Sequence, residues 1–372
     1  MAEDRDLEIL RLVFLKAEQD IINELARLRA AGLIDYHKVG SLERVRKILR
    51  SMEDDCWTYV PRMVEKQFYV SHPERYTRAP KSAVEHFIGY QNASNLSAGQ
   101  LDVVNRLVMS LMSNVMDAEA TINENLTEYI LGRRERDTFR DITLLSTVQK
   151  VAAGTSPGNT DDLISSLKQH GLTAFVDKSG RKWSLYGYAN MACRTTAQQA
   201  RTLAALTMDP EHDLYKISKH GTTCALCAPY EGRVYSKSGK SSIYPPLADA
   251  FGKIDPAGPN ELTNTYLNIH PNCLHVITPF VEAVYSKEEL AKIREFSSPV
   301  TNPYDRDPRS EAQIKAYRKK EDGRRVFMQA YREWKDLRLI APGKVPKTFQ
   351  TFLKHKMADD DKYHSYLDAA KE

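Results

Sequence analysis

The chain has 372 residues, a length that allows two or three domains of ordinary size. With 42% hydrophobic residues, 27% charged residues and 19 tyrosines, its composition is that of a folded globular protein and excludes wholesale disorder. The net charge of +4 is compatible with nucleic-acid contact without indicating it, and no apolar run approaches the ~20 residues needed to cross a bilayer.

The N-terminus and the cysteine count indicate the compartment. The first residues are acidic where a secretory signal would be basic and then apolar, so we expect synthesis in the cytoplasm and no membrane partner. Five cysteines are an odd and low number, and in a reducing compartment we expect thiols or metal ligands and no disulfide framework.

Helices are predicted throughout the first third of the chain. Apolar residues spaced three and four apart predict a long helix to about Gly32, interrupted only by Glu24. Its apolar positions are Leu7, Leu10, Phe14, Ala17, Ile21 and Leu28. A second helix is expected after Ser41, with Pro61 kinking or ending it, and a capping box at Ser97 and Gln100 predicts a third. The apolar stripes favour a helical bundle over an interaction surface.

The middle of the chain has an α+β pattern. Residues 154–159 are a predicted linker, and 161–170 a short helix closed by glycine. Two short segments, 174–176 and 182–185, flank a turn sequence with glycine and predict a β-hairpin. A helix over about 188–206 and a strand over 214–217 are expected to follow.

The last part is predicted to be helical to the end of the chain, starting from a capping box at Ser286 and Glu289. We therefore predict a mostly α protein with an α+β middle domain. The expected parts are an N-terminal helical region at 1–153, a compact α+β domain at 160–285 and a helical, basic C-terminal arm at 286–372.

Cysteine and histidine residues gather in two short motifs of the middle domain. The six residues are His220, Cys224, Cys227, His270, Cys273 and His275. Cys-x-x-Cys aims two thiolates at one tetrahedral ion, and His-x-x-Cys can supply the other two ligands. Alternatively, Cys273 and His275 point the same way from a strand. These patterns predict a structural zinc clamp, and the competing interpretation is small buried cysteines with hydrogen-bonded histidines. A cysteine nucleophile with a histidine base is a further alternative.

The C-terminal arm is locally basic. The segment from Arg309 to Arg338 contains ten basic residues and five acidic ones, with aromatic residues between them. The candidate nucleic-acid contacts are Lys315, Arg318, Lys319, Lys320, Arg324 and Arg325. This pattern predicts contact with the phosphates of double-stranded DNA without base reading. The alternative is a solvated amphipathic helix that docks on the bundle or on another protein.

Four stretches of the middle domain closely resemble the phage minor capsid protein 2 family. They are 171–185, 188–196, 227–236 and 272–275, and the likeness is sharp over roughly 171–280 and looser over the N-terminal helices. The wider head-morphogenesis family related to phage Mu protein F is also similar, with a Cys-x-x-Cys that precedes a His-Pro-x-Cys. Leu274 departs from the family pattern, in which an arginine is usual.

The resemblance implies a non-enzymatic structural protein of a tailed phage or prophage. Such a protein is present in the virion in few copies and assembles in the bacterial cytoplasm. Its expected partners are the portal, major capsid or scaffolding proteins and packaged double-stranded DNA, whose packaging or delivery it assists. The resemblance implies that His220, Cys227, Cys273 and His275 form a polar cluster, with Cys224 and His270 closer to the Mu type. It also marks Arg194, Thr195 and Thr196 as a helix motif, for which we expect a structural role.

Two other classes of protein compete with this interpretation. A capsid-packaged nuclease or toxin-like transferase would need a concave pocket in which the cysteines and histidines leave an open coordination position. A host DNA-binding protein would lose binding on truncation before Ser310 and would bind with a steep salt dependence.

Overall fold

The fold is taken from a computed structural model that describes residues 5–31, 35–69, 98–131, 173–176, 182–208, 211–251 and 267–371. The chain divides into two compact units, each built from separate stretches. The first unit comprises Met1–Leu10, Cys56–Asn114 and Asn190–Gly323. The second comprises Arg11–Asp55, Val115–Ala189 and Arg324–Glu372.

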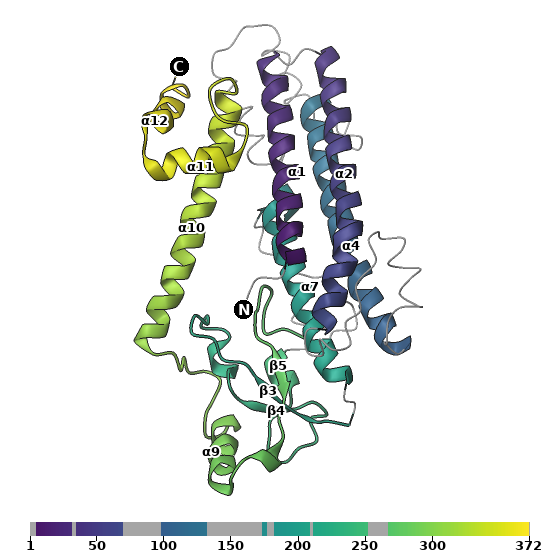
Figure 1. The fold of residues 1–372 in the computed structure, drawn as a ribbon, viewed down its shortest axis with the longest axis vertical. Coiled ribbons are helices and arrows are strands. Elements are labelled where there is room, and N and C mark those ends of the chain that lie inside the picture. The colour runs from purple at the N-terminus through teal and green to yellow at the C-terminus, as the bar shows by residue number, and fades with distance from the viewer. Residues whose placement is uncertain are drawn as a thin grey trace, which may run out of the picture. The chain divides into compact units, whose positions relative to one another are not determined.

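Long helices account for most of the described N-terminal residues (Figure 1). They are α1 at Arg5–Ala30, α2 at Asp35–Tyr69 and α4 at Ala98–Leu131. All six apolar positions predicted for the first helix are buried, so its spacing did identify the packed face. Glu24, which interrupts that stripe, is buried as well, and it forms ion pairs with Arg27 and Arg44.

The second helix is longer than predicted. It begins six residues before Ser41 and runs through Pro61 to Tyr69. Proline removes one backbone donor, but the turns after it carry the fully buried Met63, Val64 and Phe68. Their packing outweighs the local cost, so α2 does not end at the proline.

The predicted hairpin is present: β1 at Thr173–Val176 pairs antiparallel with β2 at Lys182–Ser184. Helix α7 at Leu185–Met208 follows it directly. The predicted linker at 154–159, the helix at 161–170, the hairpin turn and the Ser97 cap lie outside the described residues.

A three-stranded antiparallel sheet belongs to the first unit (Figure 1). Strand β3 at Leu214–Ile217, as predicted, lies between β4 at Val234–Ser236 and β5 at Ile277–Pro279. Tyr215, Tyr235 and Ile277 pack against α8 at Ala248–Phe251 on one side. Around Val234 a second cluster forms with Tyr244 and Phe280. The sheet therefore joins three chain segments that are distant in sequence.

The helices after the sheet are α9 at Lys287–Ser297, α10 at Glu311–Ile340, α11 at Phe349–Ala358 and α12 at Asp361–Asp368. The predicted capping box at Ser286 and Glu289 starts α9. In the second unit Tyr331, Trp334 and Phe349 form a buried aromatic cluster, and the Trp334 indole donates to the carbonyl oxygen of Pro346. Mostly α with an α+β middle is thus the observed fold class. Among the described residues, no helix is long and apolar enough to span a bilayer.

Candidate metal centre

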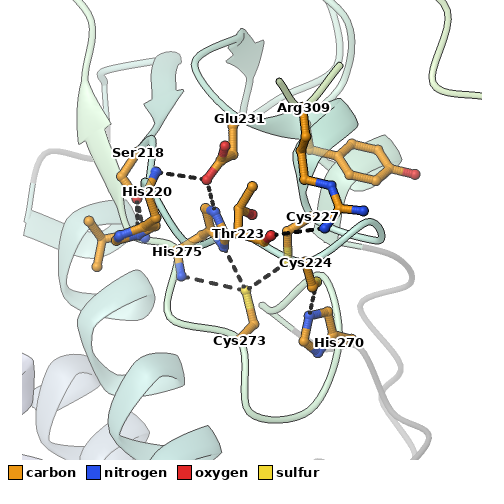
Figure 2. Close-up of polar contacts among 12 residues, drawn as sticks. Ser218, His220, Thr223, Cys224, Cys227, Glu231, His270, Cys273, His275 and Arg309 are labelled. Atoms are coloured by element: carbon orange, nitrogen blue, oxygen red, sulfur yellow. Dashed lines mark hydrogen bonds and ion pairs between the residues drawn. The ribbon is translucent and has the colours of Figure 1, made fainter. Parts of the chain in front are cut away.

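Two cysteine segments that lie 46 residues apart in the chain meet in the first unit (Figure 2). The sulfur atoms of Cys227 and Cys273 are 3.8 Å apart, and both side chains are at most 2% exposed. The Nδ1 atom of His275 lies 3.3 Å from the Cys273 sulfur. Three potential metal-binding atoms from two distant segments therefore converge in the protein interior.

Strand pairing brings the two segments together. Ile217 of β3 lies opposite Ile277 of β5, and the Ser218 amide donates to the carbonyl oxygen of Val276. The loop with Cys224 and Cys227 follows β3, and His275 lies two residues before β5. The register of the sheet thus sets the distance in space between the two motifs. Their separation in sequence does not reveal this distance.

Each cysteine lies in or beside a tight turn. In the first motif the Ala228 amide donates to the Cys224 carbonyl oxygen, so the chain between the two thiols forms one turn that leads into a short 3-10 helix at Ala228–Tyr230. In the second motif the Cys273 amide donates to the carbonyl oxygen of His270, and Asn272 adopts a positive φ of 68°. Asparagine tolerates this conformation better than most residues. The two turns point the sulfur atoms of Cys227 and Cys273 toward each other (Figure 2).

A carboxylate supports His275 from behind. The Nε2 atom of His275 lies 2.6 Å from the Glu231 carboxylate, which also accepts a hydrogen bond from the His220 amide. Glu231 is 7% exposed. When Nε2 carries the proton toward Glu231, the Nδ1 lone pair faces the Cys273 sulfur. Histidines that bind metals usually have this carboxylate–imidazole arrangement.

Gly232 lets Glu231 occupy that position. Its φ is +74°, and a Cβ atom there would come within 2.0 Å of the Lys219 side chain. The glycine amide donates to the carbonyl oxygen of Ile217, which returns the chain from the short helix toward β4. Sequence reasoning did not assign Glu231, because only the folded chain brings it to His275.

A second group of three ligand atoms shares Cys227 with the first. It consists of Cys224, Cys227 and His270. The Cys224 sulfur is 3.2 Å from Nε2 of His270, whose Nδ1 lies 2.6 Å from the carbonyl oxygen of Pro271. The imidazole therefore presents Nε2 to sulfur while its other nitrogen donates to a backbone oxygen.

Two of the three cysteines in the cluster have thiols with lowered pKa values. Hydrogen bonds from Cys227 and His275 lower the pKa of the Cys273 thiol to about 4, and hydrogen bonds from Cys227 and His270 lower that of Cys224 to about 3. Hydrogen bonds to both sulfurs, together with burial, raise the pKa of Cys227. Burial alone would lower the pKa of His275, but hydrogen bonds to Cys273 and Glu231 raise it to about 9. A metal ion would replace the protons that these groups share.

His220 belongs to neither group of ligand atoms. Its Nε2 atom lies 3.1 Å from the Ser218 hydroxyl, and its ring packs edge-on against His275 at 4.6 Å between centroids. Burial and the neighbouring His275 lower the pKa of His220. Five of the six predicted residues thus contribute to the two groups, and His220 contacts them from outside.

Helix α7 braces the second motif. The Thr195 hydroxyl accepts a hydrogen bond from the Asn272 amide at 3.1 Å, and the Gln198 side chain donates to the His275 carbonyl oxygen at 2.5 Å. Thr196 is buried, and Arg194 is half-buried. The sequence had marked the Arg-Thr-Thr stretch but not Gln198, one further turn along the helix.

Arg309 contacts the first motif from the start of α10. Its guanidinium donates to the carbonyl oxygen of Thr223 at 3.2 Å and pairs with both carboxylate oxygens of Asp307. A second arginine, Arg233, is 1% exposed and donates to the carbonyl oxygens of Pro229 and Asn302. The chain leading into α10 is therefore attached to the motif by two arginines.

The six predicted basic contacts are all exposed along α10. Further along the helix, Lys335 donates to Glu18, a carboxylate only 1% exposed, and Arg338 donates to Asn23. The predicted basic run thus divides into an exposed row and a part that holds the second unit together.

The sequence of the protein is similar to those of structural proteins of phages. The sequence matches the family described as phage minor capsid protein 2 over residues 39–335, and the protein belongs to that family. A structural protein of Lactococcus phage LL-H is 27% identical over 194 residues, covering 46% of this chain and 48% of that protein. The chain therefore spans about half the length of this relative. No solved structure matches.

Proposed function

We propose that this protein is a minor structural component of a tailed-phage head that binds the portal, capsid or scaffolding proteins. Family membership over residues 39–335 supports the structural role. In this proposal, residues 1–153 dock on the portal or capsid, residues 160–285 form a rigid module, and residues 286–372 are an arm. The protein would act in the virion after assembly in the bacterial cytoplasm.

We further propose that one Zn²⁺ ion holds the module together. Its ligands are Cys224, Cys227, Cys273 and His275, and His270 with both ring nitrogens protonated would donate a hydrogen bond to the Cys224 thiolate. The observation that carries this proposal is the convergence of Cys227, Cys273 and His275 in front of the Glu231 carboxylate. Two thiolates bound at about 2.3 Å to a tetrahedral zinc lie about 3.8 Å apart, and the two sulfur atoms are 3.8 Å apart here.

Burial of three of the four proposed ligands, Cys227, Cys273 and His275, favours a structural ion over a catalytic one. Catalytic zinc keeps one position for water or substrate, whereas the four proposed ligands would fill a tetrahedral ion. The low exposure of Cys227 and Cys273 also leaves a nucleophile little access to a substrate. These features support the scaffold role over a capsid-packaged nuclease or transferase.

Native mass spectrometry of the purified protein tests the zinc proposal. We expect one zinc ion per chain in the wild type and none in the Cys227→Ser and Cys273→Ser variants. His270→Ala should retain the ion with weaker affinity, and Cys56→Ser, a buried cysteine outside the cluster, should bind it normally. A metal-free protein that melts at the same temperature with and without added zinc would refute the clamp.

Mass spectrometry of purified particles tests the structural role separately. The protein should be present in few copies per particle and should co-purify with the portal or a capsid protein after mild disruption. Its absence from mature and precursor particles would refute a head component, whatever the result for zinc.

Contact between the arm and packaged DNA is a second proposal, favoured by the exposed row on α10. Because these side chains would meet phosphates without reading bases, binding should be independent of sequence and should weaken steeply with salt. Replacing Lys315, Lys319 and Lys320 by glutamine should lower the salt slope by about three units. An unchanged slope would indicate that the row docks on protein instead.

A further inference from the structure

A cavity of about 660 Å³ lies within the second unit. Its walls come from α1, the first half of α2, the last turn of α10 and the segment that follows α10. Part of the lining is apolar and includes Val13, Ala17, Ile48 and Met52. A volume of this size and a mixed lining are typical of a ligand site.

One wall of the cavity carries a buried cation whose charge is not balanced. Arg338 is 5% exposed and donates to the Asn23 side-chain oxygen at 2.8 Å and to the carbonyl oxygen of Pro342. Both acceptors are neutral, and burial lowers the pKa of Arg338. Within the described part of the chain, no carboxylate pairs with this guanidinium. Buried charges are costly unless an opposite charge or a dense set of hydrogen bonds compensates them.

The other charged groups of the lining leave an excess of positive charge. Glu24 forms ion pairs with Arg27 and Arg44, and Asp20 forms one with Lys16. In the described residues, Lys47, Lys347 and Asp55 form no ion pair. Six basic residues against three acidic ones give the lining a net charge of +3, and Arg338, Lys47 and Lys347 are the cations still available to a ligand.

We propose that this cavity binds an acidic peptide segment of another protein, with a carboxylate on Arg338 and neighbouring acids on Lys47 and Lys347. Apolar side chains of the same segment would cover the partly exposed Val13 and Ile48. The proposal does not depend on the metal clamp or on the role of the α10 row.

Two other anions fit the cavity less well. A DNA duplex presents its phosphates on a convex surface, which would not reach a guanidinium that is 5% exposed. A free phosphate ion would balance the charge but would leave the apolar part of the lining in contact with water. A peptide that combines carboxylates with apolar side chains complements both the basic and the apolar parts of the lining.

Binding to an immobilised ten-residue peptide library tests the proposal. The library contains only Asp, Glu, Leu, Val and Ser, and the reference library has Asn and Gln in place of the acids. We expect the wild-type protein to be retained on the acidic library and not on the reference. Retention should persist with excess duplex DNA and should fall about tenfold for the Lys47→Glu/Lys347→Glu variant.

The matched control is the Lys240→Glu/Lys362→Glu variant, which makes the same charge change at exposed lysines outside the cavity. It should bind like the wild type. Thermal melting checks that each variant is folded, and Arg338→Gln provides a second test at the buried cation. Equal retention on both libraries, unchanged binding by the Lys47/Lys347 variant, or full displacement by duplex DNA or by inorganic phosphate alone would overturn the proposal.

Discussion

At the scale of single residues, Glu231 links the imidazole of His275 to the backbone of the first motif. Its carboxylate is 2.6 Å from the His275 ring and 2.8 Å from the His220 amide nitrogen. Replacing it by glutamine preserves the shape but removes the charge that polarises the histidine. Partners of this kind usually change metal affinity 10- to 100-fold.

We therefore predict that Glu231→Gln lowers zinc affinity by about 10- to 100-fold, measured by competition with a chromophoric chelator. Glu282→Gln is the control, because the Glu282 carboxylate also accepts two hydrogen bonds, here from the Tyr244 and Arg294 side chains, and none from the cluster. Equal affinity for Glu231→Gln and the wild type would show that Glu231 has only a packing role.

A second residue, Glu119, makes the second unit sensitive to pH. Burial and the neighbouring Glu53 raise the pKa of Glu119 from 4.5 to about 7. Below pH 4.5 the carboxyl group is protonated in both the folded and the unfolded chain. As the pH rises toward 7, the unfolded chain releases this proton while the folded chain keeps it, so folding stability falls.

Because Glu119 is partly exposed, we expect the loss between pH 4.5 and 7 to be about 1 to 2 kcal/mol, after discounting for solvent screening. Glu119→Gln should remove this loss and should be more stable than the wild type at pH 8. Denaturant unfolding across the pH range measures both effects. A wild-type pH profile identical to that of the variant would contradict the raised pKa.

At the scale of elements, the start of α10 depends on its attachment to the cysteine motif. Arg309, two residues before α10 begins, donates to the Thr223 carbonyl oxygen, and its guanidinium lies over the Tyr317 ring at 5.7 Å. Truncating this side chain removes the hydrogen bond to Thr223, the ion pair with Asp307 and the cation–π contact. We therefore expect the cysteine motif and the first turns of α10 to become less stable together.

Arg309→Ala should therefore speed amide hydrogen exchange both in residues 223–228 and in the first turns of α10, by about tenfold for a loss near 1.4 kcal/mol. Arg318→Ala, an arginine exposed on the same helix, should change neither segment. Faster exchange in α10 alone would mean that the cysteine motif is held without Arg309.

At the scale of the whole molecule, local patterns predicted the elements and left their long-range pairing open. The stripe from Leu7 to Leu28 and the strand at 214–217 agree with the structure because side-chain periodicity directly reports which face is buried. Pro61 was expected to kink or end the second helix, and the helix does not end there, since burial of Phe68 and its neighbours is a tertiary effect. The predicted domain boundaries remain a prediction.

The candidate site was predictable only in part, for the same reason. Cysteine and histidine spacing marked the two motifs, but their meeting depends on the pairing of β3 with β5. Glu231, Gln198 and Arg309 reach the motifs from separate segments, and no local spacing connects them. From the sequence, Arg338 was one of ten basic residues of the C-terminal arm, and only the fold shows that it lines the cavity.

X-ray absorption at the zinc edge of the purified protein tests the central claim most directly, because it counts the atoms around the ion. The clamp predicts three sulfur atoms at about 2.3 Å and one nitrogen at about 2.0 Å, with the sulfur count falling to two in Cys224→Ser. A zinc ion surrounded mainly by oxygen, or a fully folded protein that binds no zinc, would contradict it.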